Sequence, residues 1–174
     1  NLYIVDVFCH GVPSPKIWRM YLEEKEKQYH ASIEKYEFRN KENGWNNFSI
    51  NIAFSNMKHY CVHFYEDKYM RLFLGNIDLR PSCYACHFKG FPRVSDMTIG
   101  DSWGIEKSMP DMNDDKGTSI ILVHSSKGGR MFGAIRENLI VKEARLDEVL
   151  SPTAESRRSV ELHPNRKKFW EGVK

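Results

Sequence analysis

The spacing of hydrophobic and polar positions predicts a chain in which strands and helices alternate. The apolar run 2–8, rich in β-branched and aromatic residues, is typical of a strand buried on both faces. Regular alternation over 48–54 and 58–64, with a turn at Ser55 and Asn56 between them, predicts a β-hairpin. Strands are expected at 2–8, 31–39, 48–54, 58–64, 97–101, 118–123 and 139–144.

Three segments have the 3.6-residue spacing of amphipathic helices. The clearest follows Ser14, a natural N-cap, and begins at Pro15, whose missing N–H would be unpaired at the first helical position anyway. Helices are expected at 15–29, 66–75 and 128–138. The pattern therefore predicts an α/β fold with mixed α+β character, in which helices flank a mixed β-sheet beside a cysteine-rich loop.

Composition excludes several classes of protein. The chain has 174 residues, 41% hydrophobic and 28% charged, and no apolar run reaches the roughly 20 residues of a membrane span. A net charge of +3, from 26 basic and 23 acidic residues, is too small to predict nucleic-acid binding. The basic stretch 151–174 is expected to be a solvated tail that contains the start of a further helix.

The start of the chain has none of the features of a signal peptide. It lacks an initiator Met and opens on strand-like sequence, so we expect an upstream portion to be missing. A CxxC pair in such a chain fits metal or redox chemistry in a cytoplasmic protein better than a disulfide framework.

Cys83 and Cys86 are the strongest candidates for chemistry. Thiolates are soft, charged donors, and a two-residue spacer lets both sulfurs reach one metal from a single turn. Half of a zinc site, a redox dithiol and an ordinary pair of loop cysteines remain alternatives. Pro81 and Ser82 before the pair, in place of a strand leading into a helix, favour a ligand loop over a thioredoxin-like motif.

The other two cysteines differ in context. Cys9 ends the first predicted strand and is followed by Gly11, so it is either a ligand on a rigid edge or a small buried apolar residue. Cys61 lies within a predicted strand with no second donor near it, which favours an unreactive structural thiol. His10 and His87 each follow a candidate ligand and could donate an N–H to it.

Two glycine-bearing turns could bind a phosphate or a flavin through their backbone N–H groups. They lie at 98–104 and 114–119, and neither matches GxGxxG or a Walker A motif. Ordinary turns have the same composition. Trp103 could stack on a flavin ring or fill the core, and the sequence leaves both roles open.

Four segments, taken together and in this order, resemble the C-terminal domain of the coenzyme F420 hydrogenase/dehydrogenase beta subunit family. They are DVFCHGVPSP at 6–15, LRPSCYAC at 79–86, RVSDMTIGDSWG at 93–104 and DKGTS at 115–119. The resemblance extends over about residues 1–140. A family domain at 1–150, followed by the basic tail, is the organisation that it implies.

The resemblance implies an iron–sulfur flavoprotein with a [4Fe-4S] cluster and FAD, in which archaeal members exchange hydride with the deazaflavin coenzyme F420. Cys9, Cys83 and Cys86 look like cluster ligands, and the family's fourth cysteine lies in a Gly-Thr-Pro-Cys segment that this chain lacks. By the same resemblance the flavin would be contacted by Asp96, Gly100, Asp101, Trp103, Lys116, Gly117, Thr118 and Ser119.

These expectations give an oxidoreductase that passes electrons between cluster, flavin and either coenzyme F420 or another redox partner, such as a hydrogenase or dehydrogenase subunit or a ferredoxin. No catalytic acid or base is expected, because hydride exchange at a flavin does not require one. Two alternatives stand beside it. One is a non-enzymatic zinc-binding module, and the other is an accessory or transferase partner in polysaccharide assembly, where relatives associate with pyruvyl transferases.

Overall fold

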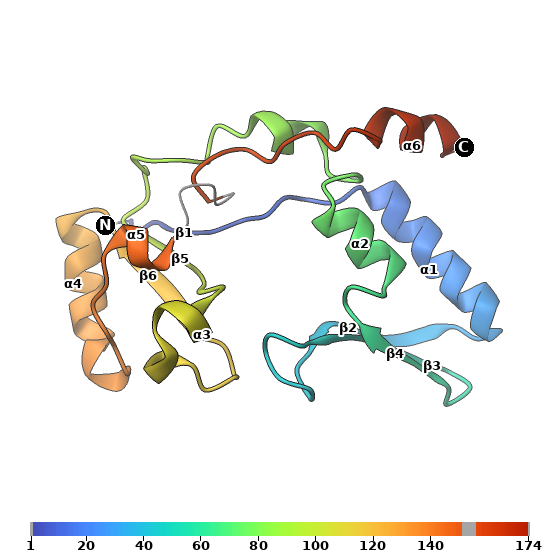
Figure 1. Ribbon diagram of the computed structural model, residues 1–174, viewed down its shortest axis with the longest axis horizontal. Helices are drawn as coiled ribbons and strands as arrows, with labels where there is room; N and C mark the ends of the chain where they lie inside the picture. Colours follow the sequence, from blue (N-terminus) through green and yellow to red (C-terminus); the bar gives the residue numbers. More distant parts are fainter. Residues whose placement is uncertain (1, 151–155, 174) are drawn as a thin grey trace. The chain divides into compact units, whose positions relative to one another are not determined.

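The computed structural model describes residues 2–150 and 156–173. The chain divides into two compact units. Unit 1 comprises Asn1–His10 and Cys86–Ser159, and unit 2 comprises Gly11–Ala85 and Val160–Lys174. Each unit contains one three-stranded sheet and several helices (Figure 1). The predicted α/β class with mixed α+β character is confirmed.

Unit 2 opens with α1 (Pro15–Tyr29), whose bounds match the predicted helix. Ile17 and Tyr21, one turn apart, are buried against the sheet of this unit. Ser14 occupies the N-cap position as expected, but its side chain makes no capping hydrogen bond. The helix ends at His30, which adopts a left-handed conformation with φ of 52°.

The sheet of unit 2 is antiparallel, in the order β2–β3–β4. Its strands are β2 (Ile33–Asn40), β3 (Ser49–Phe54) and β4 (His59–His63), so the predicted hairpin is confirmed. Alternating residues of the hairpin face α1 and α2 (Lys68–Leu74), which lie on one side of the sheet (Figure 1). The most deeply buried apolar side chains of this core are Phe48, Ile50, Ile52 and Phe54.

The N-cap of α2 is a buried carboxylate. Asp67 is fully buried and accepts hydrogen bonds from the Met70 N–H at 2.8 Å and from the hydroxyls of Tyr21 at 2.6 Å and Tyr60 at 3.0 Å. Burial of the Tyr21 hydroxyl, with its bond to Asp67, raises the tyrosine pKa strongly. The carboxylate is thus satisfied within an aromatic core, as a buried charge must be.

The end of the chain also packs into unit 2. Val160 is buried, and α6 (Arg166–Gly172) places Phe169 and Trp170 against the core cluster. The guanidinium of Arg166 donates to the carbonyl of Ile77. This segment contains a helix and leaves Lys167 and Lys168 exposed, but it is not solvated throughout, because its apolar residues pack on the core between the charged ones. Residues 151–155 lie outside the described part of the chain.

Unit 1 is built on a mixed sheet in the order β1–β5–β6. Its strands are β1 (Val5–Val7), β5 (Met97–Asp101) and β6 (Ser119–Val123), with β1 parallel and β6 antiparallel to β5. Helix α4 (Ser126–Ile135) follows β6, and α3 (Ile105–Ser108) follows β5. The short helix α5 (Leu146–Val149) and 3-10 turns at Pro81–Ala85, Pro110–Met112 and Arg136–Asn138 complete the described elements of the chain.

Two predictions for unit 1 are wrong. The first strand is not buried on both faces, because β1 is an edge strand and leaves Val7 57% exposed. Residues 139–144 do not form a strand, although they carry the apolar run Leu139 to Val141. A strand requires a partner for its backbone, and a hydrophobic pattern alone does not show whether one is present. Among the described residues, no helix is long and apolar enough to cross a membrane.

Candidate functional site

The loop that carries Cys83 is held by its neighbours in unit 2. Leu79 is fully buried and forms a β-bridge with Pro13. It also packs closely on Gly11, because a Cβ at position 11 would lie only 2.7 Å from Leu79 Cδ1. The loop then forms the 3-10 turn Pro81–Ala85. The Val12 N–H donates to Cys83 Sγ at 3.2 Å. Hydrogen bonds to sulfur are a feature of cysteines that hold metal clusters, so this contact suits a ligand.

Cys9 and Cys86 belong to unit 1. Cys9 is exposed just beyond β1, and the chain there is fixed by the Phe8 N–H, which donates to Ile99 O at 2.9 Å. The carbonyl of the next residue, His10, accepts from Lys89 Nζ at 3.2 Å. Cys86 is half-buried, and its N–H donates to Ser159 Oγ at 2.9 Å. Both cysteines therefore lie on tethered segments.

All four cysteines are free thiols. Within the residues that the structure describes, no group of three or more metal-binding side chains is gathered at one point. The candidate ligands are divided between the units, with Cys9 and Cys86 in unit 1 and Cys83 in unit 2. Cys61 is exposed on β4, which contradicts a packed structural role. The ligand set of three cysteines stays a prediction.

A polar network that the sequence did not reveal joins β1 to β5 and β6. Thr98, fully buried on β5, donates its hydroxyl to Asp6 Oδ1 and lies 2.8 Å from His124 Nε2. Arg93, whose side chain is 5% exposed, donates to Asp6 Oδ2 at 2.8 Å. Burial raises the pKa of Asp6, but the bonds from Thr98 and Arg93 outweigh it, so the pKa lies below 3.8.

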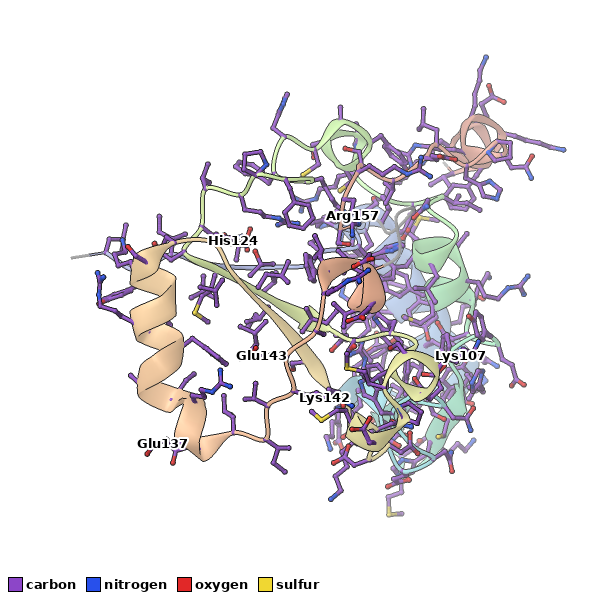
Figure 2. The ribbon with its side chains drawn as sticks, turned by 60° about the vertical axis from the view of Figure 1, so that its left-hand side comes forward. Lys107, His124, Glu137, Lys142, Glu143 and Arg157 are labelled. Atoms are coloured by element: carbon purple, nitrogen blue, oxygen red, sulfur yellow. The ribbon has the colours of Figure 1, made fainter. Side chains whose placement is uncertain are left out.

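The geometry of this network indicates which ring nitrogen of His124 carries a proton. Since the Thr98 hydroxyl is used to reach Asp6, its oxygen accepts from His124, which places a proton on His124 Nε2. His124 lies where β6 leads into α4 (Figure 2). Asp6, Arg93 and Thr98 all belong to the motif segments quoted above, and that shared membership is the one signal in the sequence that could have drawn attention to them.

Asp96, expected near the flavin, is engaged within the protein scaffold. Its carboxylate accepts from Ser125 Oγ at 2.6 Å and from the Ile4 N–H at 2.9 Å, and it pairs with Lys127 Nζ at 3.2 Å. The bonds from Ser125 and Ile4 hold the pKa of Asp96 below its ordinary value. Asp96 thus ties the approach to β1 to the N-terminus of α4, where a negative charge is favourable.

Gly100 also has a structural explanation. A Cβ at this position would lie 2.4 Å from Cδ2 of Phe8, so the glycine lets the phenyl ring pack directly on β5. Asp101 and Trp103 are exposed beyond this point, with Trp103 53% exposed. Asp96 precedes β5 and Asp101 is its last residue, so the two lie five residues apart, which at about 3.3 Å per residue separates them by about 16 Å.

A cavity of about 690 Å³ lies in unit 1 and is bordered by three of the residues expected at the flavin, Gly117, Thr118 and Ser119. Gly117 has a φ of 109°, which favours glycine. The Thr118 hydroxyl donates to Met112 O at 2.6 Å and so fixes the loop. The cavity wall is mainly apolar and includes Ile105, Met109, Ile120, Leu122, Phe132 and Val149.

The lining of this cavity also carries paired charges. Lys142 pairs with Asp111 at 2.5 Å, and Arg136 donates to Glu143 at 3.2 Å. Figure 2 shows Lys142 and Glu143 on the extended segment that runs between α4 and α5. The Lys142 ammonium lowers the pKa of Asp111. Lys116, expected at the flavin, uses its N–H to bond Asp114 and does not border the cavity.

These features fit the two groups that the resemblance implies. The candidate ligands are free, at least partly accessible thiols, and one of them accepts a backbone N–H. The cavity volume lies within the roughly 300–1,000 Å³ of ordinary ligand pockets, with an apolar wall, a few polar groups and cations at its edge, as a flavin requires.

Comparison with known proteins identifies the family of this chain. The family model for the C terminus of the coenzyme F420 hydrogenase/dehydrogenase beta subunit matches residues 1–149. A search of curated proteins and a search of solved structures gave no match. The name of the family is that of a redox-enzyme subunit that works with partner subunits. The chain belongs to the coenzyme F420 hydrogenase/dehydrogenase beta subunit family.

Proposed function

We propose that this protein is an iron–sulfur flavoprotein subunit that passes electrons between a [4Fe-4S] cluster, FAD and a redox partner, either coenzyme F420 or a partner protein. The family match over residues 1–149 is the observation that carries the proposal. The three cysteines of the motif segments support it, because they are free thiols on segments that neighbouring residues hold in place.

Cys9, Cys83 and Cys86 are the proposed cluster ligands. Iron–sulfur clusters are held by cysteine thiolates, and hydrogen bonds to the sulfurs tune their reduction potential. The Val12 N–H already donates to Cys83 Sγ at 3.2 Å, so it supplies one such bond. Cys61 is left out of the set because it lies on β4, outside the motif segments.

The proposed flavin site is the cavity beside β6. Gly117, Thr118 and Ser119 would supply backbone and hydroxyl groups to the polar edge of the flavin, and the apolar wall would exclude water. Asp101, Trp103 and Lys116 would act at its margin. Asp96 and Gly100 support the site indirectly, by holding α4 and Phe8 against the sheet.

When bound, the cluster carries single electrons and the flavin converts between one- and two-electron steps. The residues of this chain bind and orient these groups and limit the access of water. The hydrogen-bonded network of Asp6, Thr98 and His124 belongs to the scaffold of unit 1, and none of its members borders the cavity.

The proposal is tested by metal and flavin analysis of full-length protein prepared without oxygen. We expect a brown protein with about four irons per cluster and one flavin per chain. Cys83→Ser and Cys86→Ser should each lose colour and iron, whereas Cys61→Ser, the matched control on β4, should retain both. Full iron content in both loop variants would overturn the ligand assignment.

A second candidate is a zinc-binding module built from the same cysteines. Each of Cys9 and Cys86 is followed by a histidine, and three cysteines with one histidine form a common structural zinc site. The same analysis separates the two functions. Colourless protein with one zinc per chain and no flavin would favour the zinc module.

A further inference from the structure

Residues 156–159 run along the segment that follows Cys86. The carbonyl of Ser156 accepts from the Gly90 N–H at 3.3 Å and from Arg93 Nη2 at 2.9 Å. Ser159 bonds the backbone of Cys86. All of these residues belong to unit 1. The stretch 156–159, named here the strap, lies beyond residues 1–149 that the family model matches, so the family assigns it no role.

The fit between the strap and the segment 86–93 is close. Ser156 is buried, and Gly90 has a φ of 88°, a conformation that favours glycine. A Cβ on Gly90 would lie 3.0 Å from the carbonyl oxygen of Arg157, tighter than an ordinary contact. The strap and the segment therefore approach each other at a point where only a residue without a side chain fits easily.

Ser159 satisfies both backbone polar groups of Cys86. The Cys86 N–H donates to Ser159 Oγ at 2.9 Å, and the Ser159 hydroxyl donates to Cys86 O at 3.4 Å. Two bonds from one hydroxyl restrict rotation of the peptide groups on either side of Cys86. The direction of the Cα–Cβ bond, and with it the region that the thiol can reach, is restricted by the same contacts.

The other end of the strap is fixed through Arg93. The guanidinium of Arg93 donates to Ser156 O and to Asp6, and it lies over the rings of Phe8 and Phe91, 5.3 and 5.6 Å from their centroids. Asp6 and Phe8 belong to the segment that leads to Cys9. One buried arginine thus holds both the strap and the approach to the other cysteine of unit 1.

We propose that Ser159 is a positioning residue for Cys86, and that the strap sets the orientation of this thiol for its metal. The inference rests on the proposed function, since it gives the metal site a residue outside the family domain. Without the Ser159 hydroxyl, the backbone of Cys86 loses both contacts and its thiol samples more orientations. The thiol then reacts faster with a small reagent when metal-free and holds its metal in a less uniform geometry.

The test compares Ser159→Ala with Ser159→Thr and with the control Ser108→Ala. Ser108 carries a hydroxyl that donates to the Gly104 carbonyl in the same unit, far along the chain from Cys86. In metal-free full-length protein, the rate of iodoacetamide labelling at Cys86 is measured by mass spectrometry relative to exposed Cys61. We expect Ser159→Ala to raise this ratio about fivefold, the factor equivalent to one net hydrogen bond.

Ser159→Thr retains the hydroxyl and should stay within about twofold of the wild type, and Ser108→Ala should leave the ratio unchanged. In protein loaded with iron and sulfide, Ser159→Ala should also broaden the electron paramagnetic resonance signal and shift the reduction potential, as Ser159→Thr does not. An unchanged ratio in folded Ser159→Ala, or an equal rise in Ser108→Ala, would overturn the positioning role.

The positioning role of Ser159 and the proposed function can be contradicted independently of each other. Labelling is carried out without metal, so a lack of effect from Ser159→Ala contradicts the positioning role even where Cys86→Ser loses its iron. Full iron content in both Cys83→Ser and Cys86→Ser contradicts the ligand assignment of the proposed function, whatever the labelling shows. Circular dichroism of each variant identifies any that does not fold. If Ser159→Ala does not fold, Ser159→Val, which matches threonine in shape but lacks the hydroxyl, takes its place in the labelling, with the same rise expected.

Discussion

Different forces stabilise the interior of each unit. Unit 2 has an apolar and aromatic core in which Ile50 and Ile52 are fully buried between the sheet and the two helices. Unit 1 has fewer buried apolar side chains, and its strands are joined by hydrogen-bonded charges around Asp6 and Asp96. Burial stabilises without specifying direction, whereas hydrogen bonds fix the positions of the groups that make them.

This difference matters for the candidate site. Two of the three proposed ligands, Cys9 and Cys86, lie in the unit whose segments are tied by directional bonds. A metal or flavin site needs groups held within a fraction of an ångström, and hydrogen bonds supply that restraint better than an apolar contact does. The third ligand, Cys83, comes from unit 2, on a loop anchored by buried Leu79.

The largest expected effect is a truncation in the core of unit 2. Ile52→Ala should lower the free energy of unfolding of this unit by about 3 kcal/mol, because the side chain is fully buried and its loss leaves a cavity. The measurement is urea unfolding followed by hydrogen exchange of the β3 amides. Val7→Ala, on the 57% exposed edge of unit 1, should change stability by less than about 0.5 kcal/mol.

A loss at Val7 as large as that at Ile52 would contradict the contrast, because it would mean that the edge strand is buried in the native protein. Exchange of the β5 amides serves as an internal reference. It should stay constant in Ile52→Ala if the units open independently.

The second effect concerns the network of unit 1. Arg93→Met removes the partner of Asp6 and one donor to Ser156, and should lower the stability of unit 1 by about 2 kcal/mol. The value is below that of a fully buried pair, because the Asp6 side chain is 32% exposed. Arg130→Met, at an exposed position of α4, is the matched control and should have no measurable effect.

Hydrogen exchange of the β5 and β3 amides reports the two units separately. The comparison of the two units predicts that protection from hydrogen exchange is lost only in the β5 amides. Equal losses in β5 and β3 would contradict it, as would a wild-type stability of Arg93→Met, which would show that Asp6 needs no cationic partner.

The sequence predicted unit 2 better than unit 1 for a physical reason. Helix α1 and the β3–β4 hairpin depend on local periodicity and on Ser14 and Pro15 before the helix, and both were found with close bounds. The exposure of β1 and the absence of a strand at 139–144, both in unit 1, depend on which elements lie alongside. Periodicity carries no information about neighbours that are distant in sequence.

The candidate site likewise has a part that the sequence predicted and a part that it did not. The cysteines and motif segments can be read from the sequence, but Asp6 and Thr98 are 92 positions apart, and Cys86 and Ser159 are 73 apart. No local pattern links such pairs. Gly100, expected beside a cofactor, is explained by Phe8, and that contact also becomes visible only in the folded chain.

A smaller effect on the stability of unit 1 is expected at acidic pH. The folded-state pKa of Asp6 is lowered, so between that value and the ordinary 3.8 the unfolded chain binds more protons than the folded one. The stabilisation is complete above pH 3.8 and is lost as the pH falls through the folded-state pKa. Asp6→Asn should remove this part of the pH dependence of unit 1, measured as unfolding free energy between pH 7 and pH 2.

Glu37→Gln is the matched variant in unit 2, since the hydrogen bond from Lys35 lowers the pKa of Glu37 to about 2. It should leave the acid response of the β5 amides unchanged. A pH profile of unit 1 that is the same in Asp6→Asn and the wild type would show that other carboxylates, such as Asp96, account for the response.

The smallest predicted difference lies between two helix caps. Ser125 Oγ accepts from the Gly128 N–H at 3.0 Å and donates to Asp96, so Ser125→Ala should cost about 1 kcal/mol in unit 1. Ser14 caps α1 only through its carbonyl, which accepts from the Trp18 N–H at 3.1 Å and which alanine retains. Ser14→Ala should therefore stay within about 0.5 kcal/mol of the wild type in unit 2.

Melting temperatures of Ser125→Ala and Ser14→Ala, each compared with the corresponding threonine variant, measure the contrast. Threonine keeps the hydroxyl and should recover most of the loss at Ser125 and change little at Ser14. Equal losses at the two serines would mean that the cap of α1 uses its side chain after all. The same N-cap residue would then contribute alike in both units, and side-chain capping would not distinguish unit 1 from unit 2.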